Sequence, residues 1–229
     1  MGRIRFDWRK NWTKVVGGVT LATLAIICIR ALVWEHYYYA EKEGSERAAV
    51  ISTPSTKHDE VDETEISASD IDNYTVSADR PRYLKIESLG IEKARILPVG
   101  LSNSRQIETP NNIFDVGWYT DSSKPGAGGT MVIDGHNGGP TKVGVFKYLP
   151  NLAEGEIIIV ERGDGREFKY QVVENKQYSL DEANAHMNSA VNSPIPGRES
   201  LTLITCSGDW SDTQKTYMSR QFVRAILIN

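Results

Sequence analysis

The sequence predicts a mostly-β domain, an antiparallel barrel or sandwich, preceded by one transmembrane helix. Two observations predict the β domain: short strand signals follow one another closely between Gly, Pro and Asn residues, and helical patterns are scarce. The third observation is an apolar run near the start of the chain, which at about 20 residues is long enough to cross a bilayer as a helix. The 229 residues therefore divide into a head, a span, a linker and one folded domain.

Residues 1–14 form a basic head, with five basic residues against one acidic residue in a chain of formal net charge -4. The apolar run follows at residues 15–34, and its Arg30 lies near the end where a long side chain can reach the interface. The positive-inside rule places the head in the cytoplasm and everything after Trp34 outside, as a single-pass protein of the cell membrane. A cleaved signal peptide is the less favoured alternative, because the apolar region is long for one. The acidic main body predicts no binding to nucleic acid.

Residues 35–80 are poor in large apolar side chains and include an acidic run at 58–65, which predicts a flexible acidic stalk. Residues 81–229 have the length of one domain. Its Asp164-Gly165 pair predicts a hairpin, and two short helices are expected at 143–149 and 180–189. The predicted strands are, in order, 82–87, 91–97, 130–133, 156–161, 167–173, 201–205 and 221–228.

The strand at 202–205 leads to Cys206, just before residues that signal a loop. The other cysteine, Cys28, lies in the expected span, so no disulfide between them is expected. An unpaired thiol in an external domain is a candidate nucleophile. The alternative is that Cys206 is a small buried core residue, as free cysteines often are.

A thiol nucleophile needs a base or a cationic partner to become a thiolate at neutral pH. Among the four histidines, His136 ends an apolar strand and opens a glycine-rich loop, the same context that we expect for Cys206. Acyl transfer also requires donors for an oxyanion. Arg220 and Arg224 are the candidates in the last strand, and their spacing places them on one face. Asp134, two residues before His136, is expected to have a structural role at the loop edge.

The TLITC segment ending in Cys206, the Gly-His pair at the end of an earlier strand, and Arg220 in an R-x-x-x-x-A pattern resemble the sortase family of cysteine transpeptidases. The resemblance covers residues 81–229 and implies a closed, mixed antiparallel barrel of about eight strands with short helices. It makes Cys206, His136 and Arg220 the catalytic residues, with Arg224 in reserve. Thr205 is expected to donate a hydrogen bond to substrate, although a purely structural role in the strand is an equal alternative.

The resemblance also implies substrates and partners. Cys206 would attack the Thr–Gly bond of a Leu-Pro-x-Thr-Gly-like sorting signal on a surface protein or pilin. An amine acceptor such as a peptidoglycan precursor would then take the acyl group. No cofactor and no metal are expected. An N-terminal anchor without a C-terminal apolar segment is most similar to class E/F or class D sortases.

Two other classes of cysteine enzyme do not fit the sequence, and one non-enzymatic class does. Papain-like peptidases place the cysteine before the histidine, which is the wrong order here, and the His-Gly-Cys signature of L,D-transpeptidases is absent. A non-catalytic, membrane-tethered β-domain that binds an envelope partner is the remaining alternative. A buried, unreactive Cys206 would favour it.

Overall fold

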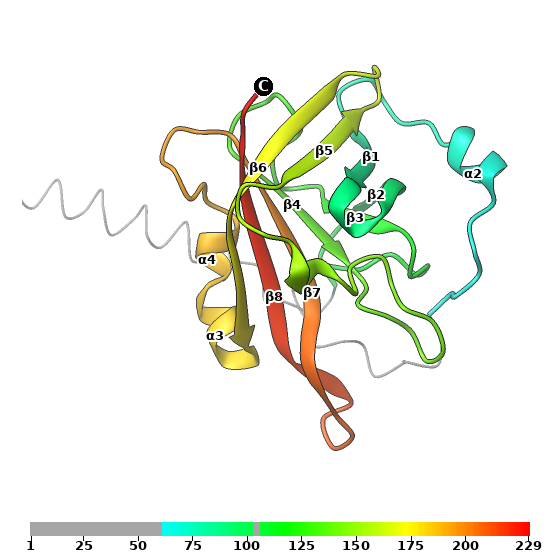
Figure 1. The fold of residues 1–229 in the computed structure, drawn as a ribbon, viewed down its shortest axis with the longest axis vertical. Helices are drawn as coiled ribbons and strands as arrows, with labels where there is room; N and C mark the ends of the chain where they lie inside the picture. The colour runs from blue at the N-terminus through cyan, green and yellow to red at the C-terminus, as the bar shows by residue number, and fades with distance from the viewer. Residues whose placement is uncertain (1–60, 103–105) are drawn as a thin grey trace, which may run out of the picture. The chain divides into compact units, whose positions relative to one another are not determined.

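The computed structural model describes residues 61–102 and 106–229, and these residues form a closed barrel of eight strands (Figure 1). The expected barrel is therefore confirmed over the sandwich. Around the barrel the strand order is β1-β2-β3-β4-β7-β8-β6-β5. The strands are β1 (Pro81–Ile86), β2 (Ile91–Val99), β3 (Val116–Tyr119), β4 (Thr130–Gly135), β5 (Ile157–Arg162), β6 (Glu167–Ser179), β7 (Ser200–Ser211) and β8 (Thr216–Leu227).

The sheet is mixed. Strands β2 and β3 run parallel, as do β4 and β7, and the other neighbouring pairs are antiparallel. The parallel pairing of β4 with β7 brings together two strands that are separated in sequence by β5 and β6. The Asp164-Gly165 turn joins β5 to β6 as expected, with Gly165 at a φ of 82° that an L side chain rarely adopts.

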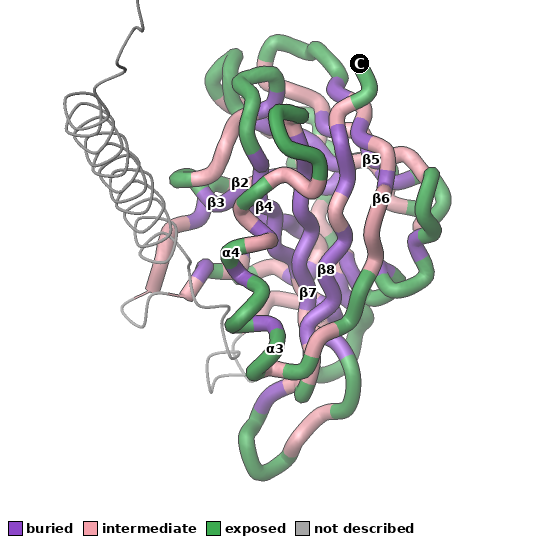
Figure 2. The backbone as a smooth tube through the Cα atoms, turned by 90° about the vertical axis from the view of Figure 1, so that its left-hand side faces the viewer, coloured by how far each residue is buried: buried purple, intermediate pink, exposed green. Residues whose placement is uncertain are grey.

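Apolar side chains from all eight strands fill the barrel interior, among them Leu84, Met131, Leu203 and Val223. A second apolar cluster, which includes Val132, Ile204 and Phe222, lies on the outer face. The helices α3 (Leu180–Ala185) and α4 (Met187–Ala190) add buried side chains to this outer cluster. Figure 2 shows buried backbone running along β4, β7 and β8, with exposed segments on α3 and at the tip of the β7–β8 hairpin.

The helix expected at 180–189 is confirmed as two short helices that meet at His186. The side chains of Ser179 and Glu182 form a capping box at the start of α3. The helix expected at 143–149 is wrong. Residues 145–148 form a turn that leads into the short 3-10 helix η3 (Leu149–Asn151), and Val143 pairs with Gly138 across the loop. Gly144 and Pro150 in this stretch disfavour a longer helix.

The two strands next to Cys206 were predicted too short. β7 continues to Ser211, and β8 begins at Thr216, five residues before the predicted start. The ladder is interrupted between Ser207 and Trp210, where Gly208 has a φ of 76°. Cys206 therefore lies just before a bulge inside a long hairpin (Figure 1).

Residues 61–80 were expected to belong to a flexible stalk, and this is wrong for that part of the linker. They contain α2 (Ala68–Asp72) and pack against the barrel. The Tyr74 hydroxyl donates to the Ile96 carbonyl at 2.6 Å, and Asp62 pairs with Asn112 in an isolated bridge. The expected head, the span at 15–34 and residues 35–60 of the stalk lie outside the described residues. Within the described part of the chain, no helix reaches the length and hydrophobicity that crossing a bilayer requires.

Candidate functional site

Cys206 and Arg220 lie directly opposite each other on the neighbouring strands β7 and β8. Directly opposed residues in an antiparallel pair place their Cβ atoms about 4.5–5.5 Å apart on the same face. The sequence spacing of 14 residues did not require this register, because it depends on the long hairpin and its bulge. The two predicted catalytic residues are thus brought together by the pairing of β7 with β8.

Alternation along the strands assigns these side chains to the outer face of the barrel. Leu203 on β7 and Val223 on β8 point into the interior, so Cys206 and Arg220, at odd offsets from them, point outward. Cys206 is partly exposed and forms no disulfide, whereas Arg220 is only 1% exposed. The Arg220 guanidinium therefore lies beneath the surface.

Two carbonyl groups of β8 hold the Arg220 guanidinium. Its Nη1 donates at 2.9 Å to the carbonyls of Tyr217 and Ser219. Arg224, the reserve candidate, lies on the same face but opposite Thr202 instead of Cys206. Its guanidinium donates to Glu174 at 3.0 Å, in a partly buried ion pair. The structure thus places Arg220 beside the thiol and gives Arg224 a structural partner.

His136 follows β4, the strand parallel to β7, at the strand-to-loop position predicted from the sequence. The preceding Gly135 has no room for a side chain: a Cβ atom there would lie 2.6 Å from the ring of Phe146, which is buried in the barrel interior. His136 Nε2 lies 2.7 Å from the Pro110 carbonyl. A carbonyl only accepts, so Nε2 is the nitrogen that donates in this contact.

The dipeptide Thr109-Pro110, in the loop between β2 and β3, orients two side chains from β4. While Pro110 accepts from His136, the Thr109 hydroxyl donates to Asp134 Oδ2 at 2.7 Å. Pro110 can approach because the neighbouring β3 residue is Gly117, where a Cβ atom would lie 3.0 Å from the proline ring. Sequence reasoning missed this dipeptide, and no local signal could have revealed it, because its partners are more than 20 residues away.

Asp134 lies near the end of β4 and is buried on the same outer face. Burial raises its pKa to about 6, although hydrogen bonds from Thr109 and the Gly135 amide, and the charge of Arg220, act in the opposite direction. Burial likewise raises the pKa of the Cys206 thiol to about 11. Arg220 lowers that pKa and Asp134 raises it further. The three groups therefore form one electrostatic cluster.

Thr205 points to the opposite face from Cys206, as neighbouring residues in a strand do. It is 1% exposed, and its hydroxyl donates to the Gly135 carbonyl at 2.8 Å. This bond ties β7 to the end of β4, one residue before His136. The structure shows a positioning role for Thr205, and its contact with substrate remains a prediction.

The segment at 62–65 binds the loop that follows His136. One carboxylate oxygen of Glu63 accepts from the backbone amides of Thr141 at 2.8 Å and Lys142 at 2.9 Å. Glu63 also accepts from the Thr141 hydroxyl, and Lys142 forms an exposed ion pair with Glu65. The N-terminal segment therefore supports the loop that follows His136.

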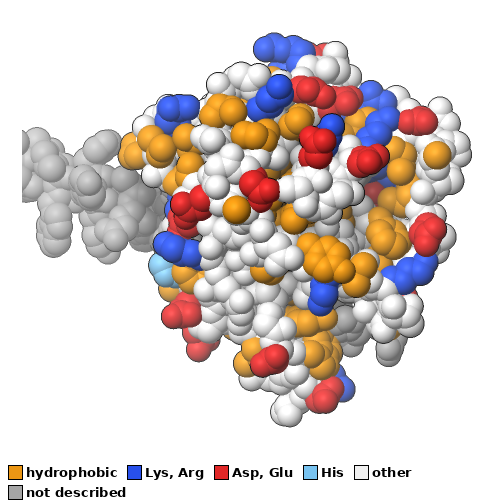
Figure 3. All heavy atoms as spheres, viewed as in Figure 1, with side chains coloured by type: hydrophobic (Ala, Val, Ile, Leu, Met, Phe, Trp, Pro, Cys, Tyr) orange, Lys and Arg blue, Asp and Glu red, His pale blue; other side chains and the backbone are white. Residues whose placement is uncertain are grey.

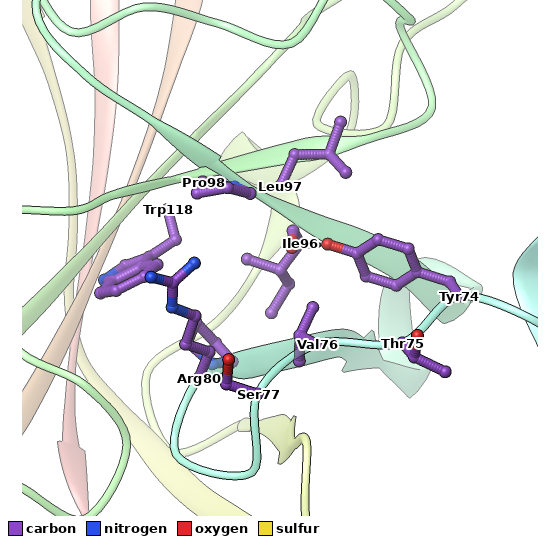
Figure 4. Close-up of a pocket in the computed structure, with 10 residues that line it drawn as sticks. Tyr74, Thr75, Val76, Ser77, Arg80, Ile96, Leu97, Pro98 and Trp118 are labelled. Carbon is purple, nitrogen blue, oxygen red and sulfur yellow. Dashed lines mark hydrogen bonds between the residues drawn. The ribbon is translucent and has the colours of Figure 1, made fainter.

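A pocket of about 450 Å³ lies elsewhere, between residues 74–81 and the strands β2 and β3 (Figure 4). Trp118, Ile96 and the ring of Tyr74 line it together with Arg80, and it includes none of the predicted site residues. On the face shown in Figure 3, basic and acidic side chains are interspersed. This face offers no basic stripe of the kind that binds nucleic acid.

The chain is similar to known proteins of one family. A family model described as the sortase domain matches residues 84–228. The pilus-related sortase C of Group B Streptococcus has a similar structure, with a TM-score of 0.51 and 19% identity over 85% of this chain and 91% of that chain. The Group B Streptococcus Pilus Island 1 sortase C2 is also similar in structure, with a TM-score of 0.50 and 19% identity over 85% of this chain and 97% of that chain.

At this level of identity the structures show the fold alone, so the expected similarity to class E/F or D stays a prediction. No curated protein matches the chain. The family model, however, covers well over half of the sequence and includes the Gly-His pair, the TLITC segment and Arg220. This chain therefore belongs to the sortase family of cysteine transpeptidases.

Proposed function

We propose that the chain is a membrane-anchored transpeptidase of the outer cell surface, which cleaves a Leu-Pro-x-Thr-Gly-like sorting signal between Thr and Gly and transfers the acyl group to an amine. Its substrates would be surface proteins or pilins, and its acceptor an amine such as that of a peptidoglycan precursor. The observation that carries the proposal is the placement of Cys206 opposite Arg220, with His136 at the end of the adjacent parallel strand.

In the first half-reaction, the Cys206 thiolate attacks the threonine carbonyl carbon and forms a carbon–sulfur bond. The negative charge that develops on the carbonyl oxygen needs donors that are already in place. Arg220 meets this need because the backbone carbonyls of β8 hold its guanidinium next to the thiol. The carbon–nitrogen bond to glycine then breaks, and protonated His136 gives a proton to the leaving amine.

In the second half-reaction, the acceptor amine attacks the thioester carbonyl and transfers a proton to His136. The tetrahedral intermediate collapses, a new amide bond forms, and the Cys206 thiolate leaves. The bond from Nε2 to the Pro110 carbonyl keeps the imidazole in one orientation through both steps. The raised pKa of Cys206 means that the substrate-free site holds mostly thiol, so formation of the thiolate with Arg220 beside it is part of the barrier.

The anchor is supported by the sequence alone: the basic head at 1–14 and the apolar run at 15–34 predict a single span with the head in the cytoplasm. Protease treatment of intact cells should remove the catalytic domain and leave the head protected. Protection of the catalytic domain would contradict the proposed orientation.

The test of the activity uses the full-length chain in detergent, incubated with a library of Leu-Pro-x-Thr-Gly-like peptides and an amine. Mass spectrometry should detect a thioacyl adduct on Cys206 and an amide product, and neither should form with Cys206→Ala of unchanged fold. A folded wild-type chain that reacts with no peptide in the library would refute the proposed signal. If a library peptide is cleaved between a residue pair other than Thr and Gly, the observed sequence replaces the proposed signal.

A further inference from the structure

Asp134 is a buried carboxyl group that the transpeptidation steps do not use. It lies on β4, paired with Gly117 on β3 and with Ile204 on β7. Cys206 follows Ile204 by two residues, so alternation places the carboxyl and the thiol on the same face of adjacent strands. Asp134 is only 9% exposed, although aspartate is rarely buried without partners.

Two donors hold this carboxyl group in a defined orientation. Oδ2 accepts from the Thr109 hydroxyl at 2.7 Å, and Oδ1 accepts from the Gly135 amide at 2.8 Å. Both donors are neutral, so they orient the group without cancelling a charge. A charge at this position therefore acts on whatever ionisable groups lie around it.

Those groups lie on the same face of the sheet or next to the strand end. Cys206 is on the adjacent strand β7, Arg220 is on β8 beyond it, and His136 follows the end of β4 two residues after Asp134. β3 contributes only Gly117, and the loop before β3 contributes the uncharged Thr109. A carboxylate here stabilises a guanidinium or an imidazolium and disfavours a thiolate.

We propose that Asp134 is a positioning residue of the transpeptidase site: its carboxylate attracts the Arg220 guanidinium on the thiol face of the sheet and adds to the effect of burial that keeps Cys206 protonated in the substrate-free enzyme. This inference rests on the proposed function, because it concerns the nucleophile of that reaction. It assigns the carboxyl group an electrostatic role in place of the structural role expected from the sequence.

The charge on Asp134 changes within a moderate pH range, because burial raises its pKa to about 6. Coupling between two ionisable groups is reciprocal, so the thiol is easier to ionise when the carboxyl group is protonated. Below this pH range the carboxyl group is protonated and does not disfavour the thiolate. Above this range the carboxylate is fully charged and disfavours the thiolate to its full extent. The thiolate population should therefore rise less steeply than tenfold per pH unit around pH 6.

The experiment measures the rate of alkylation of Cys206 by iodoacetamide in the full-length chain between pH 4.5 and 9, using mass spectrometry of the Cys206 peptide to exclude Cys28. All variants carry His136→Gln, so that the imidazole cannot contribute to the pH profile. The chain with Asp134 should show a bend near pH 6. With Asp134→Asn the bend should disappear, with equal rates below about pH 5 and rates about tenfold higher above pH 7.

A second variant, Thr109→Val, keeps the carboxyl group and removes one donor. Because that hydrogen bond lowers the pKa of Asp134, its loss should move the bend to higher pH. Thr202→Val, which removes a buried hydroxyl bond on the same strand as Cys206, should leave the bend where it is. These two variants test the proposal even if Asp134→Asn fails to fold.

Parallel profiles for the chain that retains Asp134 and for its Asp134→Asn variant, or a bend that Thr109→Val does not move, would overturn the proposal. Transpeptidation is assayed separately on chains that retain His136. If the wild type turns over peptide but the alkylation profile shows no bend, only the proposed role of Asp134 is refuted. A bend without turnover of any peptide refutes the proposed function and leaves only the coupling between carboxyl group and thiol.

Discussion

Replacing Thr205 with valine tests whether the catalytic histidine depends on the contact between β7 and β4. Valine has nearly the same shape as threonine but lacks the hydroxyl that donates to the Gly135 carbonyl at 2.8 Å. Loss of a buried hydrogen bond that leaves one partner unsatisfied costs about 1–3 kcal/mol. For a domain of this size, a cost of about 2 kcal/mol lowers Tm by roughly 4–8 °C.

The catalytic effect should exceed the effect on stability. Gly135 immediately precedes His136, so movement of its carbonyl displaces the imidazole. A misplacement of about 1 Å can cost on the order of 100-fold in rate. We expect kcat to fall by about 10- to 100-fold with KM little changed, because the thiol face of β7 is intact. A rise in KM alone would instead support the predicted contact between Thr205 and substrate.

Thr202→Val is the matched control. Thr202 lies on the same strand, is fully buried, and donates to the Ala190 carbonyl of α4 at 2.7 Å. Its loss should lower Tm by a similar amount and change kcat less than about threefold, since α4 holds no catalytic residue. Thermal unfolding and peptide turnover measured on both variants decide the question. Equal losses of kcat in the two variants would refute the positional reasoning.

Three further predictions concern charge. Arg220→Gln should lower kcat by about 10²–10³-fold without unfolding the chain. Arg224→Gln should lower the free energy of urea unfolding by about 2 kcal/mol and leave turnover intact. If only the Arg224 variant were inactive, the roles of the two arginines would be reversed. Glu63→Gln should accelerate hydrogen exchange at the Thr141 amide, because the carboxylate that accepts from it is lost. In the wild type, the protection of this amide should be lost as pH falls through the lowered pKa of Glu63. Unchanged exchange in the variant would contradict the contact. Finally, a pKa of about 11 instead of 9.0 implies that Cys206 is alkylated about 100-fold more slowly at pH 7 than an unperturbed thiol, and an equal rate would disprove the burial argument.

The candidate nucleophile and its candidate base could be chosen because each lies in a local pattern. His136 follows an apolar strand and opens a glycine-rich loop, and Cys206 lies on a strand with apolar residues. The strand patterns also predicted every strand of the barrel except β3, whereas the closed barrel itself was implied by the family resemblance. The turn at 145–148 was missed because its apolar residues match a helical period, while Gly144 and Pro150 prevent a helix.

The stalk was predicted from composition, and composition failed for residues 61–80. Low hydrophobicity suggested that this segment could not repay the entropy of ordering. In the structure its polar groups bind the barrel individually: Tyr74 donates to a carbonyl of β2, and Glu63 accepts from the loop after His136. Such contacts depend on a partner surface that exists only after the barrel has closed.

The sequence by itself determined the β class and the choice of Cys206, His136 and Arg220 as candidate site residues. The β class follows from local strand patterns, whereas the preference for Arg220 over Arg224 follows from the resemblance to the family motif. Only the tertiary structure decided that Arg220 faces the thiol, that Thr109-Pro110 orients His136, and that Asp134 is buried beside them. The physical reason is that strand register, the bulge after Ser207 and the parallel pairing of β4 with β7 depend on how all eight strands close, and no single segment carries that information.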